Sequence, residues 1–225
     1  HGWWTVEGQK MSKSLGNVVE RFRLVETYGL DQVRYFLLRE VPFGNDGDFS
    51  AKALVHRINS DLANDLGNLA QRVLSMIARN CGGAVPKQGA RTDDDQAMLD
   101  AAHVMVDRVR PLMERQAPHE ALEAIWAVVR AANAYVDHQA PWALRKTDPD
   151  RMATVLWTLA ETLRHLGLLV QPRCLGIGLG CLGPVHLGEA FVHCDSLAAF
   201  PILCLVHGVL ALPHGDLLFT LESFK

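Results

Sequence analysis

The feature of this sequence that most restricts its fold is a set of long amphipathic segments with helical spacing. Over residues 50–81, apolar side chains recur at steps of three or four, which predicts one helix of about thirty residues with a single apolar face. That face is formed by Leu54, Ile58, Leu62, Leu66, Leu69, Val73 and Ile77. Ser50 can cap its start. A helix of this kind has to bury its apolar face against other elements.

Three further segments supply those elements. The second helix is predicted to start at Thr92, where Asp95 completes a capping box, and Pro111 should kink or end it. The third covers residues 118–138, and the fourth begins with a helix-starting proline at Pro149. Four helices that each carry one apolar stripe, joined by short polar connections, predict a helical bundle.

The part of the chain before the bundle has a different character. Residues 2–6 favour a strand, and a Glu-Gly turn follows them. Residues 20–28 and 31–39 then predict two short helices, the second with Asp31 as its N-cap. Residues 41–47 are predicted to be a loop that separates this leading part from the bundle.

A short lysine- and serine-rich loop follows the first predicted strand. Its sequence is Lys10-Met11-Ser12-Lys13-Ser14. Two ammonium groups and two hydroxyls on one loop can close over a polyphosphate and meet the charge that develops in a transition state. The alternative is an ordinary solvated surface loop, which residue content alone does not exclude.

This pentapeptide resembles the second signature of class I aminoacyl-tRNA synthetases. By itself it leaves the amino acid open, because the isoleucine, valine, leucine and cysteine enzymes carry similar loops. Residues 28–31, 34–44 and 61–69 are similar to bacterial-type methionyl-tRNA synthetases. The resemblance extends from residue 1 to residue 172, with a small departure at Glu20-Arg21, where the family usually has Asp-Pro.

The resemblance implies a mainly α fold in two parts. Residues 1–49 would be the C-terminal remnant of a Rossmann-type catalytic domain, with a short strand, the lysine-serine loop and connective helices. Residues 50–172 would be an anticodon-binding α-helical bundle. The family's first ATP-binding signature is not found in the sequence, so we expect a C-terminal fragment of a longer enzyme.

The implied activity is that of a methionine–tRNA ligase, which activates methionine with ATP and Mg²⁺ and transfers it to tRNA(Met). Lys10 and Lys13 would be catalytic, binding the triphosphate and stabilising the departing pyrophosphate, with Lys13 the more important. Met11, Ser12 and Ser14 would complete the ATP-phosphate site. The fragment alone is expected to be inactive, because the groups that bind adenine, ribose and methionine would lie in the preceding part.

The bundle carries candidate RNA contacts. Asn64, Asn68 and Arg72 recur every four residues on one side of the long helix, and Trp142 follows Pro141 after the third helix. These side chains can stack on unpaired bases and bond to base edges, or they can simply be a solvated face and a hydrophobic plug. The resemblance implies that Asn68, Arg72, Pro141 and Trp142 read the anticodon loop of tRNA(Met). The alternative function is a non-catalytic RNA-binding bundle.

Charge and cysteine content set limits on partners and compartment. The formal net charge of −3 excludes a strongly basic nucleic-acid coat, so RNA contacts would have to be local. Of the five cysteines only Cys81 precedes residue 172, and no secretory signal pattern stands at the start. Both observations favour a cytoplasmic protein.

The tail, residues 173–225, is atypical. It has few charged residues, many Gly, Leu, Cys and His, and no lasting helical or strand period. We expect a frameshifted or misjoined reading, with an appended domain as the alternative. Residues 197–213 are short and broken for a membrane span, and the Cys and His spacings do not match structural zinc sites, so neither a membrane contact nor a metal site is predicted.

Overall fold

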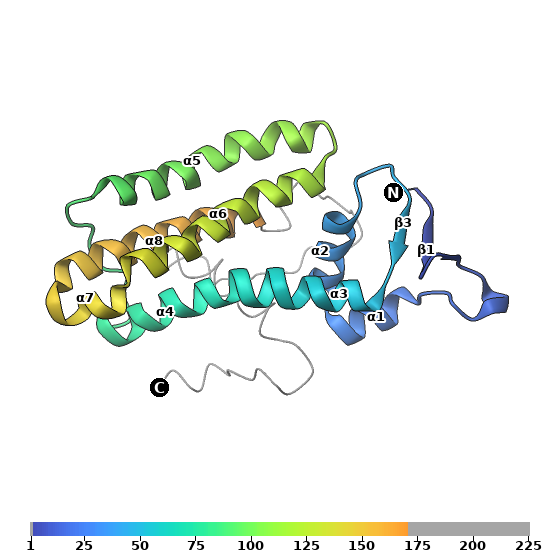
Figure 1. The fold of residues 1–225 in the computed structure, drawn as a ribbon, viewed down its shortest axis with the longest axis horizontal. Coiled ribbons are helices and arrows are strands. Elements are labelled where there is room, and N and C mark those ends of the chain that lie inside the picture. The colour runs from blue at the N-terminus through green and yellow to red at the C-terminus, as the bar shows by residue number, and fades with distance from the viewer. Residues whose placement is uncertain (1, 171–225) are drawn as a thin grey trace, which may run out of the picture.

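The computed structural model describes residues 2–170, so the assignments for the tail lie outside the described residues. Helices dominate, and a small sheet stands at one end of the elongated molecule (Figure 1). This agrees with the predicted mainly α fold. Over residues 2–170, no helix is both long enough and apolar enough to cross a membrane.

The sheet has three short strands in the order β2-β1-β3: β1 (Trp4–Val6), β2 (Gln9–Lys10) and β3 (Gly47–Phe49). β1 pairs antiparallel with β2 and parallel with β3. The loop predicted over residues 41–47 ends where β3 begins, and β3 itself was not predicted, because three residues are too few to show a strand period. Gly47 is required in it: an added Cβ would lie 2.8 Å from a Val41 methyl carbon and 3.1 Å from the Trp4 ring.

Two short helices follow the sheet's first hairpin, α1 (Arg21–Tyr28) and α2 (Leu30–Glu40). Glu20 caps α1 by accepting hydrogen bonds from the backbone N–H groups of Phe22 and Arg23. Asp31 is not the N-cap of α2. Gly29 has that position, with φ 91° and ψ 150°, and Asp31 lies in the first turn, where its charge favours the helix dipole.

The predicted long helix is present as three consecutive pieces: α3 (Ala51–Arg57), the π-helical segment η2 (Ile58–Gly67) and α4 (Asn68–Asn80). Ser50 caps it, and all seven residues of the predicted apolar stripe are buried. The π-helical middle was not predicted. Two side chains of a neighbouring helix donate hydrogen bonds to its carbonyls, Trp126 Nε1 to Asp61 at 3.2 Å and Asn133 Nδ2 to Asp65 at 3.0 Å.

The remaining helices are α5 (Asp93–Glu114), α6 (Pro118–Gln139), α7 (Pro141–Thr147) and α8 (Pro149–Val170). The capping box of Thr92 and Asp95 is present. Pro111 lies in the last turn of α5, so the predicted end is correct to within a turn. Helix α7 was not predicted, because a single seven-residue helix after a proline has too little length for a periodic pattern.

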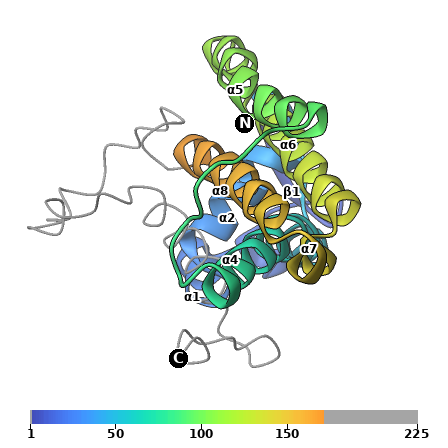
Figure 2. The ribbon, with the colours of Figure 1, turned by 90° about the vertical axis from the view of Figure 1, so that its left-hand side faces the viewer.

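These helices form a bundle, seen along its axis in Figure 2 from the end that carries α7. Helix α5 packs on α6 and α8, and α4 packs on α8. One hydrophobic cluster joins the bundle to the leading part, since Tyr35 and Phe36 of α2 belong to the same cluster as the fully buried Trp126. The Tyr35 and Trp126 rings lie 4.7 Å apart, centre to centre.

Candidate phosphate loop and nucleic-acid interface

The lysine-serine loop leaves strand β2 at Lys10 and ends in a 3-10 turn, Lys13–Leu15. Ser12 caps this turn by accepting from the Ser14 backbone N–H, and the two serine hydroxyls lie 2.6 Å apart. Gly16 ends it with φ 66°, in the left-handed region that favours glycine. The serine hydroxyls therefore shape the loop.

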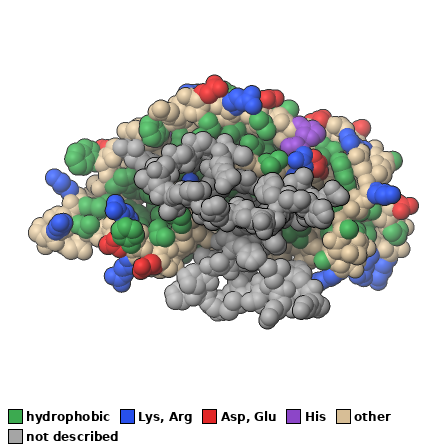
Figure 3. All heavy atoms as spheres, turned by 180° about the vertical axis from the view of Figure 1, so that it is seen from behind, with side chains coloured by type: hydrophobic (Ala, Val, Ile, Leu, Met, Phe, Trp, Pro, Cys, Tyr) green, Lys and Arg blue, Asp and Glu red, His purple; other side chains and the backbone are tan. Residues whose placement is uncertain are grey.

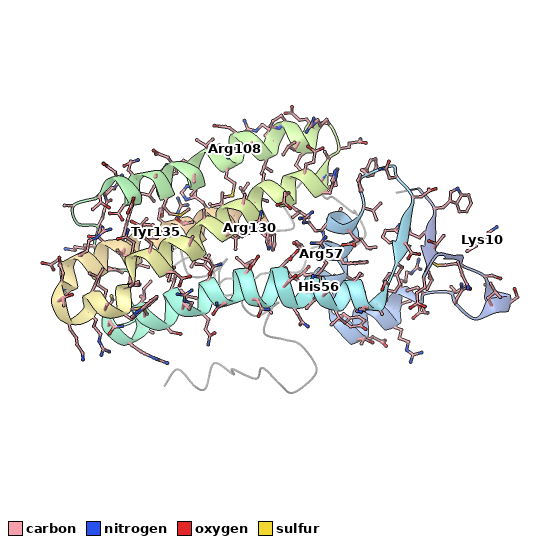
Figure 4. The ribbon with its side chains drawn as sticks, in the orientation of Figure 1. Lys10, His56, Arg57, Arg108, Arg130 and Tyr135 are labelled. Carbon is pink, nitrogen blue, oxygen red and sulfur yellow. The ribbon has the colours of Figure 1, made fainter. Side chains whose placement is uncertain are left out.

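Asn17 ties the two ends of the loop together. Its Oδ1 accepts from the Ser12 backbone N–H at 2.8 Å, and its Nδ2 donates to the Lys10 carbonyl at 3.1 Å. Lys10 and Lys13 are exposed, and Figure 4 shows Lys10 at the sheet end of the molecule. Within residues 2–170, neither ammonium group has an ion-pair partner. A fixed loop with two available cations can receive a phosphate group.

Asp48 of the unpredicted strand β3 supports the hairpin in front of this loop. One of its oxygens accepts from the Thr5 hydroxyl at 2.6 Å and from the Gly8 backbone N–H at 2.8 Å. These hydrogen bonds, the one from Thr5 foremost, hold the pKa of Asp48 below its usual value. A carboxylate distant in sequence thus fixes the turn that leads into the loop.

The polar stripe of the long helix is present. Asn64 and Asn68 are exposed and Arg72 is half-buried, on the side away from the apolar stripe. Asn64 belongs to the π-helical segment, whereas Asn68 and Arg72 lie one α-helical turn apart on α4.

The chain turns sharply between α6 and α7, and this turn presents the predicted tryptophan. Ala140 has φ 43° and ψ 58°, a left-handed conformation that is strained for a residue other than glycine. Pro141 starts α7 and is buried, while Trp142 keeps 49 % of its surface exposed. Trp142 is therefore not a buried plug of the bundle.

The structure brings Arg72 and Trp142 together. The guanidinium carbon of Arg72 lies 5.4 Å from the centre of the Trp142 ring, and Arg72 also forms an ion pair with Asp137 of α6. A groove of about 380 Å³ opens at this place, and its walls include Pro141 and Arg79. An exposed indole, a held guanidinium and a groove form a surface suited to an unstacked base.

A buried polar cluster lies at the same end of the bundle and was missed in the sequence. Asp95 is fully buried and bonds to Tyr135, to Arg151 and to the Thr92 backbone N–H. Burial alone would raise the pKa of Asp95, but these hydrogen bonds outweigh it and lower the pKa to about 2. Arg151 also donates to Gln139 at 2.7 Å, which connects the start of α8 to the last residue of α6, just before Pro141.

One group of side chains could hold a metal ion. His103 of α5 and Glu161 and His165 of α8 each offer a ligand atom, and these atoms lie within 4.8 Å of one another. The Cys and His spacings that predicted no metal site lie in the tail, so that prediction did not include this group. Glu161 and His165 are four residues apart on one helix face, and this spacing is the sequence pattern that could have predicted the group.

Comparison with known proteins identifies the family. Residues 1–74 match the family of class I tRNA synthetases (M), and residues 85–173 match the anticodon binding domain of methionyl tRNA ligase. The chain is 60 % identical over 172 residues to the methionine–tRNA ligase of Brucella suis biovar 1 (strain 1330) and 51 % identical over 176 residues to that of Mycobacterium leprae (strain TN). These matches cover 76 % of this chain and 33 % of each relative.

The comparison with solved structures points to the same proteins. Mycobacterium tuberculosis methionyl-tRNA synthetase in complex with methionyl-adenylate is 52 % identical, with a TM-score of 0.74 over 76 % of this chain and 35 % of that chain. The apo form of the same synthetase gives a TM-score of 0.70 at 48 % identity, over 76 % of this chain and 34 % of that one. The chain thus spans about a third of the length of the relatives it matches. Its two matched regions both point to one group of proteins, and the chain belongs to the methionyl-tRNA synthetase family.

Proposed function

We propose that this chain supplies the phosphate loop and the anticodon-reading bundle of a methionine–tRNA ligase. That enzyme activates methionine with ATP and transfers it to tRNA(Met) in the cytoplasm. The observation that carries the proposal is the contact between Arg72 and the exposed Trp142 ring beside a groove. Residues 1–49 would be the catalytic-domain part and residues 50–172 the RNA-reading part.

The interface has the groups that single-stranded RNA recognition needs. An anticodon presents unstacked bases, which bind by stacking on aromatic rings and by hydrogen bonds to their edges. Trp142 offers the ring, and buried Pro141 starts the helix that carries it. Arg72 and Asn68 offer donors, and the Asn68 amide also accepts. A few placed side chains suffice, which fits a chain with a net charge of −3.

The loop has the groups that a polyphosphate needs. Lys10 and Lys13 would bind the triphosphate of ATP and stabilise the charge that builds up on the departing pyrophosphate. The loop offers ammonium and hydroxyl groups and no carboxylate, so its residues fit the phosphates, and Mg²⁺ would be carried by the phosphates themselves. When bound, that ion neutralises part of the phosphate charge.

The RNA proposal is tested by titrating the chain with a methionine-specific anticodon stem-loop and with one of changed anticodon. We expect tighter binding of the first. Equal binding of both would contradict anticodon reading. The chain alone should give no methionine-dependent pyrophosphate exchange, because two lysines cannot position the reaction without the groups that bind methionine and adenosine.

The alternative is a free-standing RNA-binding bundle without catalysis. It is not favoured by the relatives, which are named as ligases over both matched regions. Sequencing the DNA directly upstream distinguishes the ligase from the free-standing RNA-binding bundle. The proposal expects the rest of a catalytic domain in the same reading frame, and a stop codon and a separate start in its place would support the alternative.

A further inference from the structure

A histidine-carboxylate group links α5 to α8, and its three residues neither belong to the phosphate loop nor line the groove. Glu161 and His165 lie one turn apart on α8, and His103 reaches them from α5. The two imidazole rings lie 4.8 Å apart, centre to centre, at an angle of 67°. Figure 3 shows histidine side chains beside acidic and basic ones on the face of the molecule seen from behind.

The backbone contact of His165 indicates which ring nitrogen carries a hydrogen. Its Nδ1 lies 2.9 Å from the Glu161 carbonyl oxygen, which can only accept, so Nδ1 carries the hydrogen. Nε2 then carries the lone pair. The Arg164 Nη2 lies 3.5 Å from this atom, which agrees with an acceptor there. Metal-bound histidines have this same arrangement, with the second ring nitrogen donating to a carbonyl or carboxylate.

The three donors need only a small movement to close on one ion. Tetrahedral zinc with bonds of about 2.0–2.2 Å places its ligands roughly 3.4 Å apart. With either ring nitrogen of each histidine allowed as the ligand, the three ligand atoms lie within 4.8 Å of one another, and His165 Nδ1 lies 3.5 Å from Glu161 Oε1. His103 is exposed, so its side chain can rotate toward α8 without opening the core.

One neighbour competes with an ion. Arg164 donates to both oxygens of Glu161, at 2.9 and 2.6 Å. Its guanidinium therefore occupies the carboxylate and adds a positive charge near the group. An ion that binds Glu161 has to share or displace this contact, so removing the Arg164 charge should strengthen metal binding.

We propose that His103, Glu161 and His165 bind a borderline divalent ion of the Zn²⁺ type, with water completing its coordination, and that this ion ties α5 to α8. Two imidazoles and one carboxylate suit zinc and its neighbours in the first transition row, whereas Mg²⁺ and Ca²⁺ prefer oxygen ligands alone. None of the three residues belongs to the sites proposed for ATP and tRNA. A failed metal-binding test would therefore leave the proposed function unaffected.

The test uses the untagged full chain with its five cysteines alkylated, which removes thiolate ligands. Co²⁺ is titrated while its visible absorption is followed, and Zn²⁺ is then added as competitor. We expect one saturable equivalent. His103→Gln and His165→Gln should each weaken binding by at least 10- to 100-fold, the loss known for groups that merely support a ligand. Arg164→Gln should strengthen it.

His56→Gln is the matched control, since His56 is exposed on α3 and labelled in Figure 4, on a helix other than α5 or α8. It should bind Co²⁺ like the unaltered chain. His103→Gln decides the outcome if His165→Gln fails to keep its helical circular dichroism. Absence of saturable binding in the unaltered chain, or unchanged binding in folded His103→Gln, would overturn the proposal.

Discussion

Arg72 of α4 and Trp142 of α7 are in cation–π contact, with the guanidinium carbon 5.4 Å from the centre of the indole ring. Such a contact at an exposed site contributes about 0.5–1 kcal/mol. Its larger effect is on position, because it holds a cation and an exposed ring next to one another before any RNA arrives. Asp137, paired with Arg72, restricts the guanidinium further.

Trp142→Ala should leave the fold nearly intact and weaken binding of the methionine anticodon stem-loop. The ring is 49 % exposed, so its removal creates no closed cavity, while stacking of about 1–3 kcal/mol is lost. Trp142→Phe should recover part of that loss because it keeps a π-face. Thermal melting and stem-loop titration are measured side by side.

Trp126 provides the control for this experiment. Its ring is 1 % exposed, and Trp126→Ala should cost roughly 3–5 kcal/mol of unfolding free energy. If Trp142→Ala lowered the melting temperature as far as Trp126→Ala and left binding unchanged, Trp142 would be a packing residue, and the anticodon assignment would depend on Asn68 and Arg72.

Asn68→Ala and Arg72→Ala should reduce discrimination between the methionine stem-loop and one of changed anticodon. Hydrogen bonds from a charged donor such as Arg72 contribute about 1.5–3 kcal/mol, and those from a neutral amide about half as much. The exposed Arg108 of α5 offers a matched loss of one charge (Figure 4). Arg108→Ala should leave the affinity ratio of the two stem-loops unchanged. A ratio that falls equally in all three variants would speak against base reading.

Lys13→Ala in a full-length ligase carrying this region should lower the rate of methionine activation by about 10²–10³, as expected for loss of one group that stabilises transition-state charge. Methionine binding should change little. Stopped-flow or pyrophosphate-exchange kinetics give both quantities. Lys52, an exposed lysine of α3, is the control position. Equal losses of rate and methionine affinity in Lys13→Ala would indicate a structural lysine.

Stability in acid should depend on Asp95. Its pKa is lowered to about 2 in the folded chain, against about 3.9 when unfolded, so its contribution is present at neutral pH. That contribution, about 2–3 kcal/mol, should disappear as the pH falls from 4 to 2, where the carboxylate takes up a proton. Urea unfolding of the unaltered chain and of Asp95→Asn at several pH values measures it. The two curves should differ at pH 7 and converge near pH 2, and parallel curves would contradict the assignment.

Local sequence rules were enough for the elements that are long and periodic. The apolar stripe from Leu54 to Ile77 predicted a helix because each of its residues packs on the same side, and the Thr92 box predicted a helix start because both of its bonds are local. The π-helical segment could not be foreseen this way. Its carbonyls are bonded by Trp126 and Asn133, which are distant in sequence.

The sites also divide into features that local spacing predicts and features that depend on residues distant in sequence. The spacing of Asn68 and Arg72 was sufficient to place them on one helix face, but only the folded chain shows that Arg72 reaches Trp142. Asp48 and Asp95 support the loop and the bundle end through partners that lie far away along the chain, apart from the local Thr92 contact. Likewise, no local sequence pattern predicts that α5 lies beside α8 and brings His103 to His165.

The hydrophobic cluster that joins α2 to α6 has a consequence for proteolysis. Tyr35 and Phe36 pack in one core with Trp126, and the exposed residues 42–46 before Ser50 contain no Lys or Arg at which trypsin could cut. The connection between α4 and α5 is mostly exposed and contains no regular helix over residues 84–92. Within the bundle, trypsin should therefore cut first near Lys87 or Arg91, and the two products should remain associated through the core until a denaturant separates them.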